Sequence, residues 1–171
     1  MIEAAIYRVC QFFSALRAGD LGADDLEFVR NQLSLAQQHL FLQMPASDQQ
    51  HAVAVAQTLL RQGWSDSELI QAALLHDVGK AKGGLGLPYR VSIVLLQTFM
   101  PSVLVKLSTE GQGWRRPYYV HQHHPEIGAR LAADAGSSPR VVELISKHQV
   151  SVLGQERNEW LMALKAADAS H

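Results

Sequence analysis

The residues of this 171-residue chain best suited to chemistry are histidines and aspartates on the apolar faces of predicted helices. His51, for example, is followed by Val55 and Leu59 at spacings of four and eight residues. This spacing places the three side chains on one face of a helix, so the imidazole is expected to point into the core. Five predicted helices each direct one such group inward: His51, His76, His124, His148 and Asp168.

One histidine on an apolar face is more often a hydrogen-bonded core residue than a metal ligand. A carboxylate is harder to explain, because burying it without a partner costs several kcal/mol. Asp168 therefore needs a cation or strong hydrogen-bond donors, and Asp77 stands beside His76 at the end of its helix. A divalent metal site accounts for all of these groups with one cause. Imidazole and carboxylate ligands without sulfur suit Mn²⁺, Fe²⁺, Co²⁺ or Zn²⁺, and Mg²⁺ at one position.

Short motifs carry these residues: His51-x-x-x-Val55-Ala56, Ala72-Ala73-Leu74-Leu75-His76-Asp77-Val78-Gly79-Lys80, His124-Pro125-Glu126-Ile127-Gly128, Lys147-His148 and Ala166-Ala167-Asp168. Over about residues 47–169 they resemble the HD superfamily of metal-dependent phosphohydrolases. The resemblance implies a site for two divalent metal ions (Fe, Mn, Co, Zn or Mg). It assigns the first ion to His51, His76, Asp77 and Asp168, and the second to His124 and His148, with Asp77 bridging both.

Two further histidines, His121 and His123, lie close enough to His124 to replace it as a ligand. The pattern His-Pro-x-x-Gly favours His124. Gln149 follows His148, where the HD-GYP cyclic-di-GMP phosphodiesterases carry a second histidine, and the Gly-Tyr-Pro signature of that group is missing. Cyclic-di-GMP is therefore not the expected substrate.

The resemblance implies hydrolysis of a phosphomonoester or phosphodiester, with a phosphorylated small molecule, in the first place a nucleotide, as substrate. A divalent ion lowers the pKa of its bound water towards about 7, which supplies hydroxide at neutral pH. Asp77 and Lys80 would be the catalytic residues, and Lys80, one helical turn after His76, would also bind the substrate phosphate. Weaker candidates for substrate binding are the arginines whose guanidinium groups suit phosphate: Arg90, Arg115 and Arg116.

An oxygenase and a binding module are the alternative functions. The HD fold also resembles the di-iron oxygenases related to myo-inositol oxygenase. Oxygen consumption by the Fe²⁺ form with a polyol or an organophosphonate would favour that activity. A non-catalytic HD regulatory module would bind a nucleotide or a partner without turnover. Lys80 favours hydrolysis, because an ammonium group suits a phosphate.

The elements that position these residues are predicted to be helices throughout, because apolar residues recur at helical spacing and no segment alternates between hairpin turns. The expected fold class is all-α, an HD-domain helical bundle at residues 47–171 with an N-terminal helical appendage at residues 1–46. Caps, glycines and prolines set the helix boundaries. The predicted helices span 2–18, Asp24 or Asp25 to about 44, Ser47 to Gly63, Ser65 to about 75, 91–107 (kinked or shortened by Pro101), Pro125 to about Gly136, Pro139 to about 148 and 155–169. Loops are predicted at 79–88 and 108–117.

Composition limits the partners and the location of the protein. Lys and Arg total 15 against 16 Asp and Glu, so a net charge of −1 attracts neither extended nucleic acid nor an anionic membrane. The single cysteine excludes an intrachain disulfide, and the start at Met1 lacks the basic region of a secretory signal, so a cytoplasmic protein is expected. The longest uncharged stretch, residues 91–105, is too short to cross a bilayer. It is expected to be a core helix, with the surface of a homodimer as the alternative.

Overall fold

The computed structural model describes residues 19–84, 86–150 and 158–171, and every regular element in this part of the chain is helical. The all-α prediction is confirmed, whereas the helix predicted at 2–18 lies outside the described residues. The elements are α2 (Ala23–Gln32), α3 (Leu35–Phe41), α4 (Ala46–Arg61), α5 (Ser67–Leu75), the 3₁₀ helix η1 (Val78–Gly83), α6 (Leu87–Phe99), α7 (Pro101–Leu107), the 3₁₀ turn η2 (Gly113–Arg115), α8 (Arg116–Asp134), α9 (Pro139–Lys147) and α10 (Glu159–Ala169).

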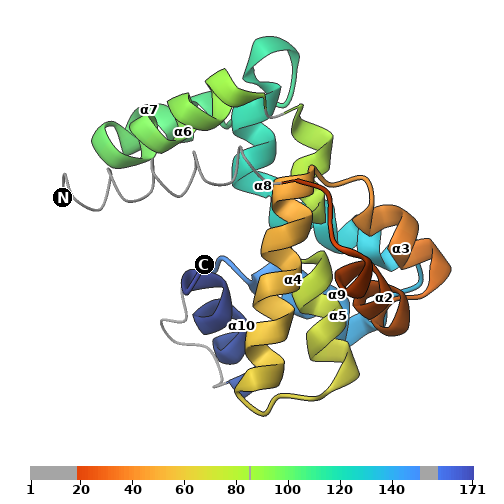
Figure 1. Ribbon diagram of the computed structural model, residues 1–171. Coiled ribbons are helices and arrows are strands. Elements are labelled where there is room, and N and C mark those ends of the chain that lie inside the picture. Colours follow the sequence, from red (N-terminus) through yellow and green to blue (C-terminus); the bar gives the residue numbers. More distant parts are fainter. Residues whose placement is uncertain (1–18, 85, 151–157) are drawn as a thin grey trace.

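The main body packs α4, α5, α9, α10 and the second half of α8 around one apolar core, and α2 and α3 cover one side of it (Figure 1). Side chains such as Val55, Leu59, Leu75 and Leu164 are fully buried there. Burying this apolar surface is the main driving force for the fold. α6, α7 and the beginning of α8 extend to one side of the body (Figure 1).

The segment before α4 forms two helices where one was predicted. α2 ends at Gln32, and Ser34 begins α3 by accepting a hydrogen bond from the backbone N–H of Gln37 at 3.4 Å. The side chain of Gln37 accepts one from the backbone N–H of Ser34 at 2.9 Å. This capping box satisfies donors at a helix start, so the chain breaks at Ser34 and does not continue to residue 44.

The caps predicted for the next two helices, Ser47 and Ser65, are also wrong. α4 begins after Pro45, and the Ser47 hydroxyl donates to Asp48 at 3.1 Å instead of capping the helix. α5 begins after Asp66, whose carboxylate accepts from the backbone N–H of Glu68 at 3.0 Å. A carboxylate is the better partner for the positive end of a helix, which explains why Asp66 takes this position.

The loop predicted at 79–88 contains ordered structure. Residues Val78–Gly83 form η1, and α6 begins at Leu87, four residues before the predicted start. The helix predicted at 91–107, kinked or shortened by Pro101, is divided at that point, because Met100 separates α6 from α7. The loop at 108–117 contains η2, and α8 already begins at Arg116.

α6 and α7 do not form the predicted core helix. Their buried apolar side chains, Ile93 and Leu104, belong to a small separate cluster with Tyr118. Large apolar side chains on the same two helices face solvent, among them Phe99 at 63% and Val105 at 60% exposure. Within the described residues, no helix has both the length and the apolar character needed to span a membrane.

α8 contains Pro125 in its interior, whereas a helix starting at this proline was predicted. Proline has no N–H, so it cannot donate to the carbonyl four residues earlier, which belongs to His121. That carbonyl accepts instead from Nδ1 of His124 at 2.7 Å. A side chain thus replaces the missing backbone donor, and the helix continues to Asp134.

Candidate metal centre

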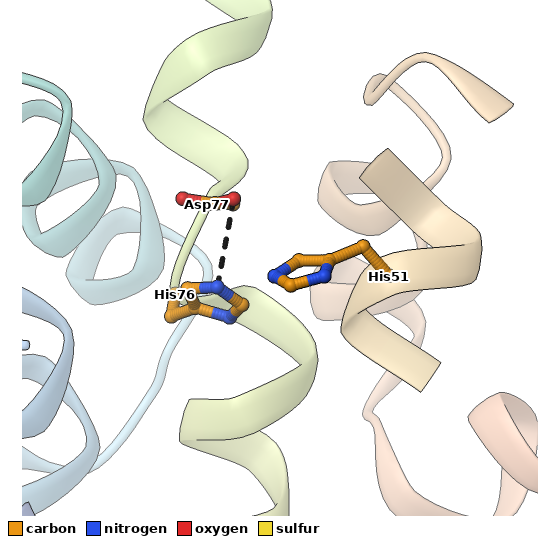
Figure 2. Close-up of side chains that lie close together, drawn as sticks. All are labelled: His51, His76 and Asp77. Atoms are coloured by element: carbon orange, nitrogen blue, oxygen red, sulfur yellow. Dashed lines mark ion pairs between the residues drawn. The ribbon is translucent and has the colours of Figure 1, made fainter. Parts of the chain in front are cut away.

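The structure brings together the side chains of all six residues predicted to bind metal. They come from α4, from the end of α5, from the middle of α8, from the residue after α9 and from α10. Figure 2 shows three of them, with His51 facing His76 and Asp77 across the space between α4 and α5. The six are His51, His76, Asp77, His124, His148 and Asp168.

One group of donor atoms lies around Oδ2 of Asp77. Nε2 of His76 is 3.5 Å from this oxygen and 3.5 Å from Oδ1 of Asp168 (the first pair is dashed in Figure 2). Nε2 of His51 is 2.9 Å from the same oxygen of Asp168. His51, His76 and Asp77 lie close enough together to hold a single ion.

The second group of donor atoms lies around the other oxygen of Asp77. Oδ1 is 3.2 Å from Nε2 of His124 and 3.9 Å from Nε2 of His148. These three residues also lie close enough to hold an ion. The two carboxylate oxygens of Asp77 therefore face two different sets of ligands, which is the arrangement that a bridging carboxylate requires.

The local backbone orients the three buried histidines. In each, Nδ1 lies 2.7–2.8 Å from the carbonyl oxygen three residues earlier. A carbonyl only accepts hydrogen bonds, so Nδ1 carries a hydrogen and Nε2 is the nitrogen that faces the site and can bind a metal ion. Such carbonyls are available because His76 and His148 follow the last residue of their helices, and because Pro125 frees the partner of His124.

The Nε2 atoms of His76, His124 and His148 are buried and have no hydrogen-bond partner among the described residues. Leaving a buried polar atom unsatisfied costs about 1–3 kcal/mol, so three at one place need an explanation. Ligand atoms about 2.0–2.2 Å from a tetrahedral ion are about 3.3–3.6 Å apart, and the distances here, 2.9–3.9 Å, span this value. Divalent ions therefore fit both groups.

A comparison with protein families matches the HD domain to residues 49–171, which is most of the chain. The chain belongs to the HD domain family. This HD domain therefore falls in a superfamily of metal-dependent phosphohydrolases that includes non-catalytic members, and membership implies that it binds divalent metal. No match was found among curated proteins or among solved structures.

The ionisable groups of the HD domain's candidate site create an environment that favours the binding of cations. Burial alone would raise the pKa of both aspartates, but Lys80 and His76 hold the pKa of Asp77 well below its usual range. The hydrogen bond with His51 and the charge of His76 do the same for Asp168. Burial opposes protonation of His76, yet the two carboxylates raise its pKa to about 9. His148 has its pKa lowered to about 3 by burial and by the charge of His76. Both carboxylates are therefore ionised at neutral pH.

The two groups of ligands differ in their access to solvent. The side chains of His124 and His148 are at most 1% exposed. Those of His51 and Asp168 are 27% and 33% exposed, so Asp168 is less buried than its position on an apolar face suggests. Lys80 is 26% exposed on η1, and its Nζ donates to Oδ2 of Asp77 at 2.5 Å. A substrate would therefore approach from the side of His51, Asp168 and Lys80.

Two glycines allow the HD motifs to approach each other closely. η1 packs against α8, and a Cβ atom on Gly79 would lie 2.1 Å from the carbonyl oxygen of His124. A Cβ atom on Gly128 would lie 3.2 Å from the backbone nitrogen of Gly79. Each glycine follows a ligand within its motif, but the spacing within one motif does not reveal a contact with the other. Their missing side chains let Asp77 and His124 come within 3.2 Å.

The arginines predicted to bind substrate have protein partners in the HD domain. Arg90 forms two hydrogen bonds with Asp48, at 3.0 and 3.1 Å, on the first turn of α4. Arg115 pairs with Glu110 at 2.7 Å. Arg116 donates from Nε to the carbonyl oxygen of Lys82 at 3.1 Å. Of the cations predicted to contact phosphate, Lys80 is the one in contact with a metal-site residue among the described residues.

Proposed function

We propose that this HD domain protein is a phosphohydrolase that uses two divalent metal ions. The observation that carries the proposal is the convergence of three buried, unpaired Nε2 atoms on an aspartate whose two oxygens face different ligand sets. The first ion would be held by His51, His76, Asp77 and Asp168, and the second by Asp77, His124 and His148. When bound, such ions polarise a phosphoryl oxygen and supply hydroxide at neutral pH.

The chain's own residues would bind and orient the substrate. Lys80 carries its positive charge beside the more exposed ligand group, where it can hold a phosphate oxygen. Asp77 holds the ammonium group in that position through their hydrogen bond. In the reaction an oxygen from water bonds to phosphorus, the ester P–O bond breaks, and the alcohol leaves with a proton.

A phosphorylated small molecule, with a nucleotide as the first class to test, is the proposed substrate. The position of Lys80 favours this substrate over a polyol, because a lysine ammonium neutralises phosphate charge and has no such role toward a hydroxyl group. It does not discriminate against an organophosphonate, the other substrate class of the oxygenase alternative. A homodimer formed through the exposed apolar residues of α6 and α7 stays a prediction.

The decisive experiment replaces Asp77, the residue shared by both groups. Metal content per chain would be measured by mass spectrometry, and turnover with a panel of nucleotides and p-nitrophenyl phosphate. We expect two ions per wild-type chain, and loss of both ions and of turnover in Asp77→Ala. Asp77→Asn keeps the shape of the side chain and tests whether the charge is responsible.

A matched control is Asp134→Ala, because this exposed aspartate lies at the end of α8, away from the ligands. It should retain both ions and full turnover. Circular dichroism would establish that each variant keeps its helices. Full turnover in Asp77→Ala, or a wild-type chain that takes up no metal after incubation with Mn²⁺ or Fe²⁺, would overturn the proposal.

A further inference from the structure

His121 lies beside the metal-site residues without belonging to either ligand group. It precedes His124 by one turn of α8, and its backbone carbonyl orients that histidine. The two ring centroids are 6.3 Å apart. His121 is only partly buried, and its ring nitrogens have no hydrogen-bond partner among the described residues. It therefore presents a free imidazole at the edge of the site.

The neighbouring His123 serves as a contrast on the same helix. Its ring stacks against Tyr119, with the centroids 4.3 Å apart, so packing accounts for its position. No comparable ring stacking is present for His121 within the described part of the chain. The two histidines have the same side chain and nearly the same place in the sequence, but the ring neighbour of His121 is the ligand His124, and it lies farther away, at 6.3 Å between centroids.

The packing of η1 against α8 identifies the side of the site that His121 faces. Gly79, the residue before Lys80, packs against the backbone of His124, one turn after His121. Lys80 and His124 contact the two oxygens of Asp77, so His121 lies on the helix beside both groups. In either protonation state an imidazole keeps an N–H donor, which can bind an oxyanion alongside an ammonium group.

We propose that His121 and Lys80 together bind the phosphate group of a phosphomonoester. The inference rests on the proposed function, in which two ions would bind the same phosphate. A monoester has three oxygens without a substituent, whereas a diester has two. Two ions together with two further donors supply enough partners for three such oxygens, which makes a monoester the better match. His121 would therefore contact the substrate and would not be a metal ligand.

The test measures the affinity of inorganic phosphate, which carries the same oxygens and needs no turnover. Calorimetry would be performed on wild-type protein loaded with Mn²⁺ and on the variants His121→Ala, His121→Gln and His123→Ala. We expect His121→Ala to weaken phosphate binding about 10- to 100-fold, the loss typical of a hydrogen bond to a charged group. His121→Gln, which retains an N–H donor, should recover part of it, and His123→Ala should bind phosphate as the wild type does.

Metal content and substrate class complete the test. All variants should keep the wild-type number of ions, and p-nitrophenyl phosphate should be a better substrate than bis-p-nitrophenyl phosphate. Loss of metal in His121→Ala would make His121 a ligand and overturn the inference, as would unchanged phosphate affinity. If the wild type binds phosphate through His121 but hydrolyses no ester, the proposed function fails and the binding role of His121 stands.

Discussion

The approach of η1 to α8 allows a sharp prediction about Gly79. Replacing Gly79 with alanine puts a Cβ atom 2.1 Å from the carbonyl oxygen of His124 and 2.8 Å from the backbone nitrogen of Gly128. Contacts below 3.0 Å essentially never occur for a Cβ atom, and ordinary contacts begin at 3.4 Å, so the two backbones must separate by about 0.9–1.3 Å (3.0 − 2.1 and 3.4 − 2.1). Rotating a side chain cannot relieve a clash with backbone atoms.

The same movement would separate Asp77 from His124 and weaken the second group of ligands, Asp77, His124 and His148. A displacement of about 1 Å can reduce turnover about 100-fold. Overpacking of this kind costs about 1–3 kcal/mol, which corresponds to a fall in Tm of about 2–12 °C for a chain of this size. We therefore expect Gly79→Ala to fold, to lose one of two bound ions and to lose most of its turnover.

Two matched glycine variants set the scale for this measurement. In Gly128→Ala the Cβ atom would lie 3.2 Å from the backbone nitrogen of Gly79, so the losses of metal and of stability should be smaller. In Gly19→Ala the Cβ atom would have no atom of the described residues within 4 Å, and this variant should behave as the wild type does. Metal content, turnover and thermal unfolding would be measured for all three. If Gly79→Ala matched Gly19→Ala in metal content, the argument that glycine positions Asp77 against His124 would be refuted.

Three further predictions concern proline, protons and metal. Pro125→Ala should stabilise α8 in the metal-free protein by up to about 3 kcal/mol, as chemical denaturation would measure. It should also weaken binding of the second ion about 10- to 100-fold in a metal titration, because the new amide competes with His124 for the carbonyl of His121. A metal affinity equal to that of the wild type would count against this reasoning. The pKa of His76 in the metal-free protein is raised to about 9, so a proton competes with the metal for this histidine below that pH. Metal affinity measured by calorimetry should therefore rise as the pH increases from about 6 towards about 9. An affinity that does not change with pH would contradict this prediction. Removing metal with a chelator should lower Tm by about 5–10 °C, which is the effect of withdrawing a ligand present at about 100 times its Kd. Adding Mn²⁺ should restore the original Tm. A Tm that does not change on chelation would contradict this prediction.

Several helix boundaries could not be predicted from local sequence, because neighbouring residues are almost equally suited to cap the helix. Ser47 and Ser65 both begin the pattern of a capping box, yet Pro45 and Asp66 take the cap positions. Ser34 begins the same pattern and does cap a helix. Which residue caps depends on where the chain must turn to bury its apolar face, and this is settled by packing with other helices.

The stretch from 91 to 105 illustrates the same limit for burial. Its apolar composition predicts a core helix, but composition does not say how much partner surface is available. α6 and α7 pack on the beginning of α8 and extend away from the main body, so Leu95 and Phe99 stay exposed. Apolar residues are common on protein surfaces, and the rule that they lie inside holds only in part.

The sequence by itself determined the all-α class, the family resemblance and the kinds of ligand, because helical spacing directs histidines and aspartates to one face regardless of what packs there. Tertiary structure decided how these groups meet. Only the fold turns one oxygen of Asp77 towards His76 and the other towards His124 and His148, since the three come from different helices. The contact between Gly79 and α8 sets the distance between Asp77 and His124. Neither segment's own sequence pattern predicts this contact.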